Sequence, residues 1–309
     1  MQQIVINDFS ELACGENLIQ KANISPIENG IEYEVLSENS LEYIDWLNLS
    51  KVITIVAEFF DVHTCAIVRE NMILSVALGS SNETALQKCI DTNPLSITDS
   101  TVGFTKEVTL EVARQISTMK VRNVVSSKFS KEALGYLQDR DINIVQIKNS
   151  LQELLGQTAF ELRTTPFGYL SQEKNMSKLT KSSFKVVSKA KPTQQMAEDA
   201  IFAWKVAKYT NSNSFVVAKD LATVAIVQNQ VSEVEGIEKA IDIACENSKE
   251  AVLALDSVIE NENSLNPIIQ GRIGLVIEAG NSVNSEKVLD LANKYELSII
   301  HTGIRNYKY

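Results

Sequence analysis

A polar turn between two apolar segments carries the side chains of this sequence best suited to binding a small molecule. Residues 208–214 read Lys-Tyr-Thr-Asn-Ser-Asn-Ser, between an amphipathic segment ending at Ala207 and an apolar run from Phe215 to Ala218. Its uncharged amides and hydroxyls both donate and accept hydrogen bonds. Asn and Ser are also common in loops between a helix and a strand, where their side chains bond nearby backbone groups without any further role. Composition alone therefore leaves a structural loop and a ligand site as alternatives.

The order of residues in this turn resembles a motif of one enzyme family. Lys-Tyr-Thr-x-Ser-Asn-Ser, an apolar strand and Ala-Lys are similar to a segment of the aminoimidazole-carboxamide ribonucleotide (AICAR) transformylases. These enzymes move a formyl group from formyl-tetrahydrofolate to the amine of the ribonucleotide in purine synthesis. The resemblance implies catalytic roles for Asn213 and Lys208, and substrate contacts for Tyr209 and Ser212. It implies formyl-tetrahydrofolate as the cofactor if the chain is active, and no other cofactor is expected.

The segment that should carry the proton-transfer residues departs from the family. The pattern Lys-His-x-Asn-Pro-x-Gly-Val-Ala follows a buried strand, and here it falls at residues 69–77. Arg69 replaces the lysine, and Glu70 replaces the histidine that is the family's proposed proton shuttle. A histidine titrates near neutral pH without tuning, whereas a glutamate needs strong desolvation, which an adjacent arginine opposes. Arg69 and Glu70 are therefore either a degenerate catalytic pair or an ion pair without a catalytic role.

Segments near both ends of the chain keep part of the family's nucleotide-holding motifs. Residues 12–22 resemble Arg-Tyr-Gly-x-Asn-Pro-His-Gln-x-Ala, with Asn17 retained and the charged and aromatic positions lost. Near the C-terminus, Arg305 matches the family's phosphate-contacting arginine, and Tyr307 replaces an aromatic residue two positions later. The resemblance adds Asn17, Arg305 and Tyr307 to the expected substrate-binding residues.

A glycine-rich motif of the family has been filled with larger side chains. The segment similar to Gly-x-Gly-x-Gly-Gln-x-Ser-Arg has Ala225, Val227 and Asn229 at the glycine positions and Glu233 at the arginine. Glycine allows a backbone to approach a ligand closely, and a carboxylate in place of the arginine repels an anionic group. We therefore expect weaker ligand binding at this segment than in the family.

The elements that must position these residues alternate between apolar strands and amphipathic helices. Short connections between such elements are typical of layered α/β domains. The resemblance makes the fold specific: two cytidine-deaminase-like α/β lobes with mixed central sheets, joined near residues 171–195. The lobes are expected at residues 1–175 and 176–309, with an exposed connection at 171–183. In the first lobe, helical spacing marks residues 41–60, 83–90, 106–117 and 131–140, and buried strands are expected at residues 65–68, 121–125 and 142–147.

Composition and charge exclude several classes of protein. The formal net charge of −10 without a long basic run argues against nucleic acid or an anionic membrane as the main partner. No apolar run approaches the ~18 residues of a membrane span. The 4 cysteines lack metal-like spacing and predict reduced thiols in a cytoplasmic protein. Neither a Cys-x-x-Cys pair nor a His-x-Glu motif is present, which argues against a metal site and against zinc-deaminase chemistry.

Three functions remain compatible with this sequence. The first is an active AICAR formyltransferase, which lacks the matching histidine. The second is a divergent, non-catalytic homologue that pairs with an active relative or retains nucleotide binding. The third is a relative that transfers a formyl or acyl group to another substrate through Asn213, Lys208 and Arg305. The resemblance also implies a homodimer, because the family's sites lie at a subunit interface, and no segment resembles the family's cyclohydrolase part.

Overall fold

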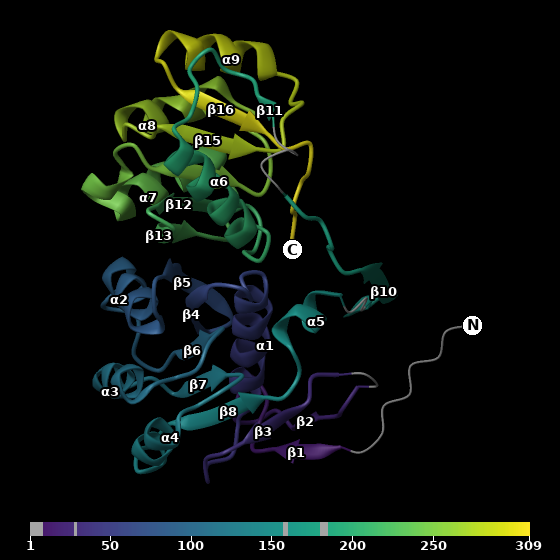
Figure 1. Cartoon of the computed structure of the whole chain (residues 1–309). Helices are drawn as coiled ribbons and strands as arrows, with labels where there is room; N and C mark the ends of the chain where they lie inside the picture. The colour runs from purple at the N-terminus through teal and green to yellow at the C-terminus, as the bar shows by residue number, and fades with distance from the viewer. Residues whose placement is uncertain (1–8, 28–29, 157–159, 180–184) are drawn as a thin grey trace. The chain divides into compact units, whose positions relative to one another are not determined.

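The computed structural model describes residues 9–27, 30–156, 160–179 and 185–309. The chain divides into two compact units, Met1–Leu154 and Leu155–Tyr309. Each unit has its own mixed sheet and its own helices, as the sequence predicts (Figure 1).

The first unit is built on a six-stranded mixed sheet with the order β5-β4-β6-β7-β8-β3. Strands β6, β7 and β8 are parallel, and the other pairs are antiparallel. A separate hairpin, β1 (Ser10–Leu12) with β2 (Ala22–Ile24), precedes this sheet. The strands of the sheet are β3 (Tyr33–Val35), β4 (His63–Arg69), β5 (Met72–Gly79), β6 (Thr101–Phe104), β7 (Asn123–Ser126) and β8 (Asn143–Ile147).

Two layers of helices cover this sheet. α1 packs on one face, and α2, α3 and α4 form a row on the other (Figure 1). Ser81, Thr109 and Ser130 begin α2, α3 and α4, because each side chain accepts a hydrogen bond from the first helical turn. The helices are α1 (Tyr43–Ala57), α2 (Asn82–Thr92), α3 (Leu110–Thr118), α4 (Lys131–Gln138) and α5 (Leu151–Gly156).

The second unit repeats this plan with the sheet order β13-β12-β14-β15-β16-β11. Strands β14, β15 and β16 are parallel, and β12 runs antiparallel to both β13 and β14. An isolated hairpin, β9 (Phe160–Thr165) with β10 (Gly168–Glu173), precedes the sheet. Its strands are β11 (Lys185–Val186), β12 (Phe215–Lys219), β13 (Ala222–Val227), β14 (Val252–Leu255), β15 (Leu275–Glu278) and β16 (Ser298–His301).

The core of the second unit follows from the alternation of side chains along its strands. Leu253 and Leu255 pack into one apolar cluster with Ile237, Ile268 and Val288 from three helices. α6 packs against β12, β14 and β15, whereas α7, α8 and α9 contact one another in order. The helices are α6 (Gln194–Ala207), α7 (Glu233–Ala244), α8 (Leu265–Gln270) and α9 (Ser285–Lys294), with short 3-10 turns at Cys245–Ser248 and Glu262–Ser264.

A two-residue β-turn marks the same place in both units. Glu70 and Asn71 join β4 to β5 at φ 51° and 59°, and Asp220 and Leu221 join β12 to β13 at φ 52° and 57°. Paired positive φ values are typical of a type I′ hairpin turn. The segment at residues 69–77 is therefore a hairpin turn and the strand after it.

The division into units falls earlier in the chain than the boundary expected after residue 175. The difference is the hairpin β9–β10, which groups with the second unit. The boundary at residue 175 stays a prediction. Residues 180–183 of the expected connection lie outside the described residues. No helix in the described part of the chain is long and apolar enough to cross a membrane.

Candidate functional site

The polar loop 208–214 lies at one edge of the sheet in the second unit. Phe215, directly after the loop, pairs with Leu255, the last residue of β14. Because β12 and β14 are antiparallel, the start of β12 and the end of β14 meet at one edge. The carboxyl ends of parallel strands are where open α/β sheets usually bind ligands.

Asp256 holds this edge together. It is 1% exposed. Its Oδ2 accepts a hydrogen bond from Ser212 Oγ at 2.5 Å, and its Oδ1 accepts one from the Ser214 amide at 3.1 Å. Its backbone oxygen accepts a hydrogen bond from the Asn306 amide at 2.8 Å. Burial raises the pKa of Asp256, while the hydrogen bonds from Ser212 and Ser214 oppose that rise. The side chain thus anchors both the loop and the C-terminal segment.

Lys208 and Ser212 attach the loop to neighbouring backbone. Lys208 is buried, donates from Nζ to the Ser177 carbonyl at 2.9 Å, and lies 5.3 Å from the centre of the Tyr209 ring. The Ser212 amide donates to the Lys308 carbonyl, and the Lys308 amide donates to Ser212 Oγ, both at 2.8 Å. These predicted site residues therefore have structural partners of their own.

Asn213, Arg305 and Tyr307 share this edge and are less enclosed. Asn213 donates from Nδ2 to the Gln230 carbonyl at 3.1 Å and is half-buried. Arg305 is exposed, with its guanidinium 5.8 Å from the Tyr307 ring, and forms no ion pair with the described residues. Burial raises the pKa of Tyr307. At this edge, the guanidinium of Arg305 is thus accessible to an anionic group.

Asn306 is a residue of this edge that the sequence did not indicate. It is 1% exposed, and its Oδ1 accepts from Asn175 Nδ2 at 2.9 Å and from Ser177 Oγ at 3.2 Å. Its Nδ2 has no hydrogen-bond partner among the described residues. No local pattern marks Asn306, because it acts through partners far away in the sequence.

Glu233, which replaces the family's arginine, has a structural role. As the first residue of α7, it accepts hydrogen bonds from the Glu260 amide at 2.9 Å and from Ser264 Oγ. The Asn261 amide lies 3.5 Å from its Oε1. The carboxylate thus fixes the loop after β14, which a cation at this position could not do.

The other predicted site residues belong to the first unit. Arg69 Nε lies 3.4 Å from Glu70 Oε1, with side chains 36% and 65% exposed, so the ion pair expected as one alternative is present. Asn48 Oδ1 holds the β4–β5 turn by accepting a hydrogen bond from the Asn71 amide at 2.8 Å. Asn17 lies in the loop of the β1–β2 hairpin and contacts Gln20 Oε1 through its amide and side chain. None of these is placed relative to the edge of the second unit.

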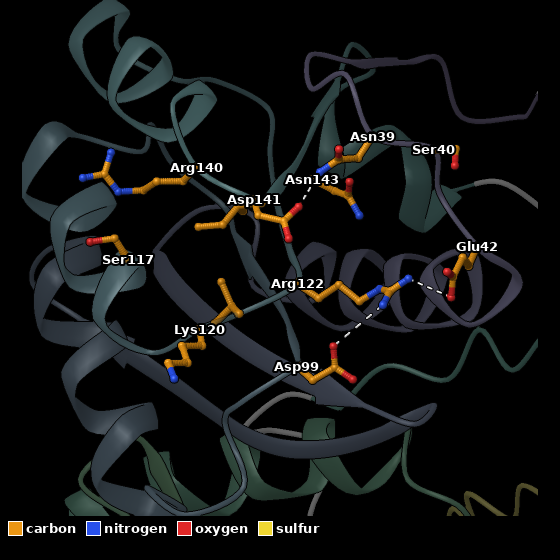
Figure 2. A pocket seen from close by; sticks show the side chains of 12 residues that line it. Asn39, Ser40, Glu42, Asp99, Ser117, Lys120, Arg122, Arg140, Asp141 and Asn143 are labelled. Carbon is orange, nitrogen blue, oxygen red and sulfur yellow. Dashed lines mark hydrogen bonds and ion pairs between the residues drawn. The ribbon is translucent and has the colours of Figure 1, made fainter.

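A polar cavity of about 620 Å³ lies at the amino ends of β6, β7 and β8 in the first unit (Figure 2). Arg122 crosses it, with Nε 2.7 Å from Asp45 Oδ1 and Nη2 2.7 Å from Glu42 Oε2. These contacts, led by Asp45, raise the pKa of Arg122. Asn143 Oδ1 is buried and has no hydrogen-bond partner in the described part of the chain. Arg122 is neutralised by carboxylates, and Lys120 and Arg140 are further cations in the lining of the cavity.

The described residues contain no group of three His, Cys, Asp or Glu side chains placed to hold a metal ion. Both sites can bind a ligand through hydrogen bonds and through attraction between opposite charges. At the second unit's edge these are amides, hydroxyls and one open guanidinium, the groups that bind a polar or phosphorylated small molecule.

Comparison with known proteins identifies relatives along the whole chain. The bifunctional purine biosynthesis protein PurH of Aquifex aeolicus is 30% identical over 316 residues, covering 100% of this chain and 61% of that protein. The PurH of Persephonella marina is 31% identical over 96% of this chain and 59% of its own length. The protein of Dictyostelium discoideum is 29% identical over 96% and 57%. This chain spans about three fifths of the length of these relatives.

The family model described as AICARFT/IMPCHase bienzyme matches residues 2–243. That match includes the degenerate hairpin turn at Arg69 and Glu70 as well as the loop 208–214. The agreement of a match over most of the chain with a two-unit mixed α/β fold settles the relationship: the chain belongs to the AICARFT/IMPCHase bienzyme family.

Proposed function

We propose that this chain is a divergent purine-biosynthesis homologue that does not transfer formyl groups at an ordinary rate and retains a nucleotide-binding edge. The observation that carries the proposal is the environment of Glu70. Its carboxylate is 65% exposed and ion-paired with Arg69. General acid–base catalysis by a carboxyl group needs desolvation, and Arg69 cannot exchange a proton near neutral pH. The turn therefore lacks a proton shuttle.

The filled glycine positions support the same proposal. Ala225 is 1% exposed and Val227 is 3% exposed, and both belong to the apolar core cluster. Side chains packed in this way have become part of the fold. Together with the structural role of Glu233, they leave this segment without the open backbone and the cation expected for an anionic ligand.

Retained nucleotide binding is supported by Arg305 and Asn213. Arg305 is exposed and forms no ion pair with the described residues, so its guanidinium can form two parallel hydrogen bonds to a phosphate. Asn213 is half-buried and keeps its side-chain Oδ1 and one Nδ2 hydrogen for further bonds. We expect weak binding, because the remaining groups of this edge are used within the protein.

The direct test mixes the purified protein with AICAR ribonucleotide and formyl-tetrahydrofolate and follows tetrahydrofolate release, with an active family member as the positive control. We expect no release above background, whereas turnover near ~10 s⁻¹ would show that another residue moves the proton. Calorimetric titration with the ribonucleotide alone tests binding. Arg305→Ala should weaken it about tenfold or more, and the exposed Arg114→Ala in α3 serves as the matched control.

The alternative function is formyl or acyl transfer to AICAR or a related substrate, with formyl-tetrahydrofolate as the donor. The intact loop 208–214 favours it, since Lys208 and Asn213 keep ordered positions. A low but saturable release of tetrahydrofolate that Asn213→Ala abolishes would favour this alternative over the first proposal.

We also propose that the chain forms a homodimer and works in the cytoplasm. The exposed apolar hairpin β9–β10 supports assembly, and free cysteines support a reducing compartment. Nucleic acid is not proposed as a partner, because the net charge is −10. Light scattering at micromolar concentration tests assembly, and a mass of one chain would contradict it.

A further inference from the structure

The hairpin β9–β10 stands apart from the other strands of the second unit. Its two strands pair only with each other among the described residues. Every residue of β9 and β10 is exposed except Thr165, which is partly covered. A two-stranded ribbon without a partner is at best marginally stable in water. The hairpin therefore has the properties of a segment that another surface completes.

One face of this ribbon carries three of its large apolar side chains and is called its apolar face below. Successive residues of a strand point to opposite faces, so Phe160, Leu162 and Thr164 share a face. The register places Thr164 opposite Tyr169, which adds Tyr169 to that face. Phe160, Leu162 and Tyr169 are 58%, 44% and 74% exposed. The register also places Ser171 and Glu173 on that face, opposite Leu162 and Phe160. The other face carries Glu161, Arg163, Leu170 and Gln172.

We propose that β9 pairs antiparallel with β9 of a second copy, around a two-fold axis at Leu162. This proposal rests on the homodimer proposed above and names the strands that join its subunits. Leu162 then faces Leu162 of the other copy, Glu161 faces Arg163, and Phe160 faces Thr164. The two hairpins form one four-stranded sheet, in which Phe160, Leu162 and Tyr169 of both copies share a face.

Charge selects this register over its neighbours. Shifting the pairing by two residues in one direction places Glu161 opposite Glu161 of the second copy, and the other direction places Arg163 opposite Arg163. Like charges directly opposite one another destabilise a sheet. Shifting by one residue sets the apolar face of one hairpin against the polar face of the other. Only the pairing centred on Leu162 forms two Glu161–Arg163 pairs.

The strand β9 also suits this role better than β10. Glu161 and Arg163 form no ion pair within the described part of the chain, so each can pair with the opposite charge of a second copy. Glu161 accepts a hydrogen bond from Gln172 Nε2 at 2.8 Å, and its charge also acts on Lys308. β10 carries Glu173 as its single charge and has no complementary residue. An exposed edge of β9 is the template to which a second strand adds.

A charge exchange in the 309-residue chain tests this β9–β9 pairing, called the seam below. Glu161→Arg and Arg163→Glu should each raise the dimer dissociation constant about tenfold or more, because two attractive pairs become repulsive. The double variant E161R/R163E should return it to within about threefold of the wild-type value. Sedimentation velocity over a concentration series measures the constant, and circular dichroism verifies that each variant is folded. If the dissociation constant of the double variant stays as high as that of the single variants, the seam is overturned.

A cysteine test checks the register directly. In a Cys245→Ser background, which removes the exposed native thiol, Leu162→Cys should form a disulfide-linked dimer with oxidised glutathione. Arg163→Cys should not, because its two copies would lie farther apart than the ~4.4–6.8 Å that a disulfide allows between Cα atoms. A cross-link at residue 163 without one at 162 would overturn the register.

The outcomes separate this inference from the proposals on which it rests. A wild-type chain that is monomeric at every concentration overturns both the homodimer and the seam. A dimer that neither charge variant weakens, and that Leu162→Cys does not cross-link, overturns the seam alone. Formyl transfer activity has no bearing on either result.

Discussion

At the scale of single residues, Asp256 connects parts of the chain that are far apart in the sequence. Its carboxylate accepts from Ser212 and Ser214, and its backbone oxygen accepts from Asn306. Burial is the largest influence on this group and raises its pKa. Burial therefore disfavours the ionised form of this carboxyl group, and the hydrogen bonds offset that penalty only in part.

The first prediction concerns the pH dependence of stability. A carboxyl group with a raised folded-state pKa favours folding at low pH, and this contribution is lost as pH rises from about 3.9 through the folded value. The unfolding free energy of Asp256→Asn relative to the wild type should therefore increase between pH 4 and pH 7. Urea unfolding at both pH values measures this difference. The exposed Asp290→Asn is the control, and an equal change in both variants would contradict the assignment.

The second prediction concerns the turn at Glu70. An exposed ion pair contributes little, so Glu70→Gln should change the free energy of unfolding by less than about 0.5 kcal/mol. Asn48→Ala should cost about 1–3 kcal/mol, because it leaves the Asn71 amide without its buried acceptor. Denaturant unfolding compares the two variants. A larger loss for Glu70→Gln than for Asn48→Ala would show that the ion pair holds the turn.

At the scale of secondary-structure elements, close packing of α7 on β12 positions the edge that carries loop 208–214. A Cβ atom at Gly236 of α7 would lie 2.2 Å from the Phe215 ring. Phe215 is 1% exposed and directly follows the loop. The helix can approach the strand this closely because position 236 has no side chain.

The third prediction follows from this contact. Gly236→Ala should lower the free energy of unfolding by about 1–3 kcal/mol through overpacking. Gly135→Ala in α4 has no atom within 4 Å of the new Cβ. It should raise the free energy of unfolding by about 0.5–1 kcal/mol, because alanine favours a helix over glycine. Thermal and denaturant unfolding give the two signs, and destabilisation by both substitutions would contradict the packing argument.

At the scale of the whole molecule, the departures from the family lie in both units. Arg69 and Glu70 form a surface ion pair in the first unit. In the second, Glu233 fixes a loop and Ala225 and Val227 belong to the core. Each substituted residue therefore has a structural partner or a packed position. Reverting one of these positions to the family's residue therefore leaves the other substitutions in place.

The fourth prediction tests this distribution. The double variant R69K/E70H restores the family's pair at the turn, and its rate of tetrahydrofolate release should stay at least about a hundredfold below the typical ~10 s⁻¹. The wild type and an active family member, assayed in parallel, define the lower and upper limits. Recovery to the typical rate would show that the turn alone accounts for the loss.

The sequence by itself determined the local features of this protein. Apolar periodicity predicted strands at residues 121–125 and 142–147, and the structure confirms them as β7 and β8. The motif order predicted the family and two mixed α/β units. These features depend on contacts within a few residues, so the local sequence specifies them.

Only the tertiary structure decided which distant residues meet. The sequence of a single strand does not specify the strand order of the sheet, because hydrogen-bonded neighbours come from distant parts of the chain. The sheet order brings Asp256 to Ser212, and the chain's last residues to Ser177 through Asn306. Folding likewise brings the loop after β14 to Glu233 and three carboxylates to Arg122. A buried charge needs partners, and long-range packing alone supplied them here.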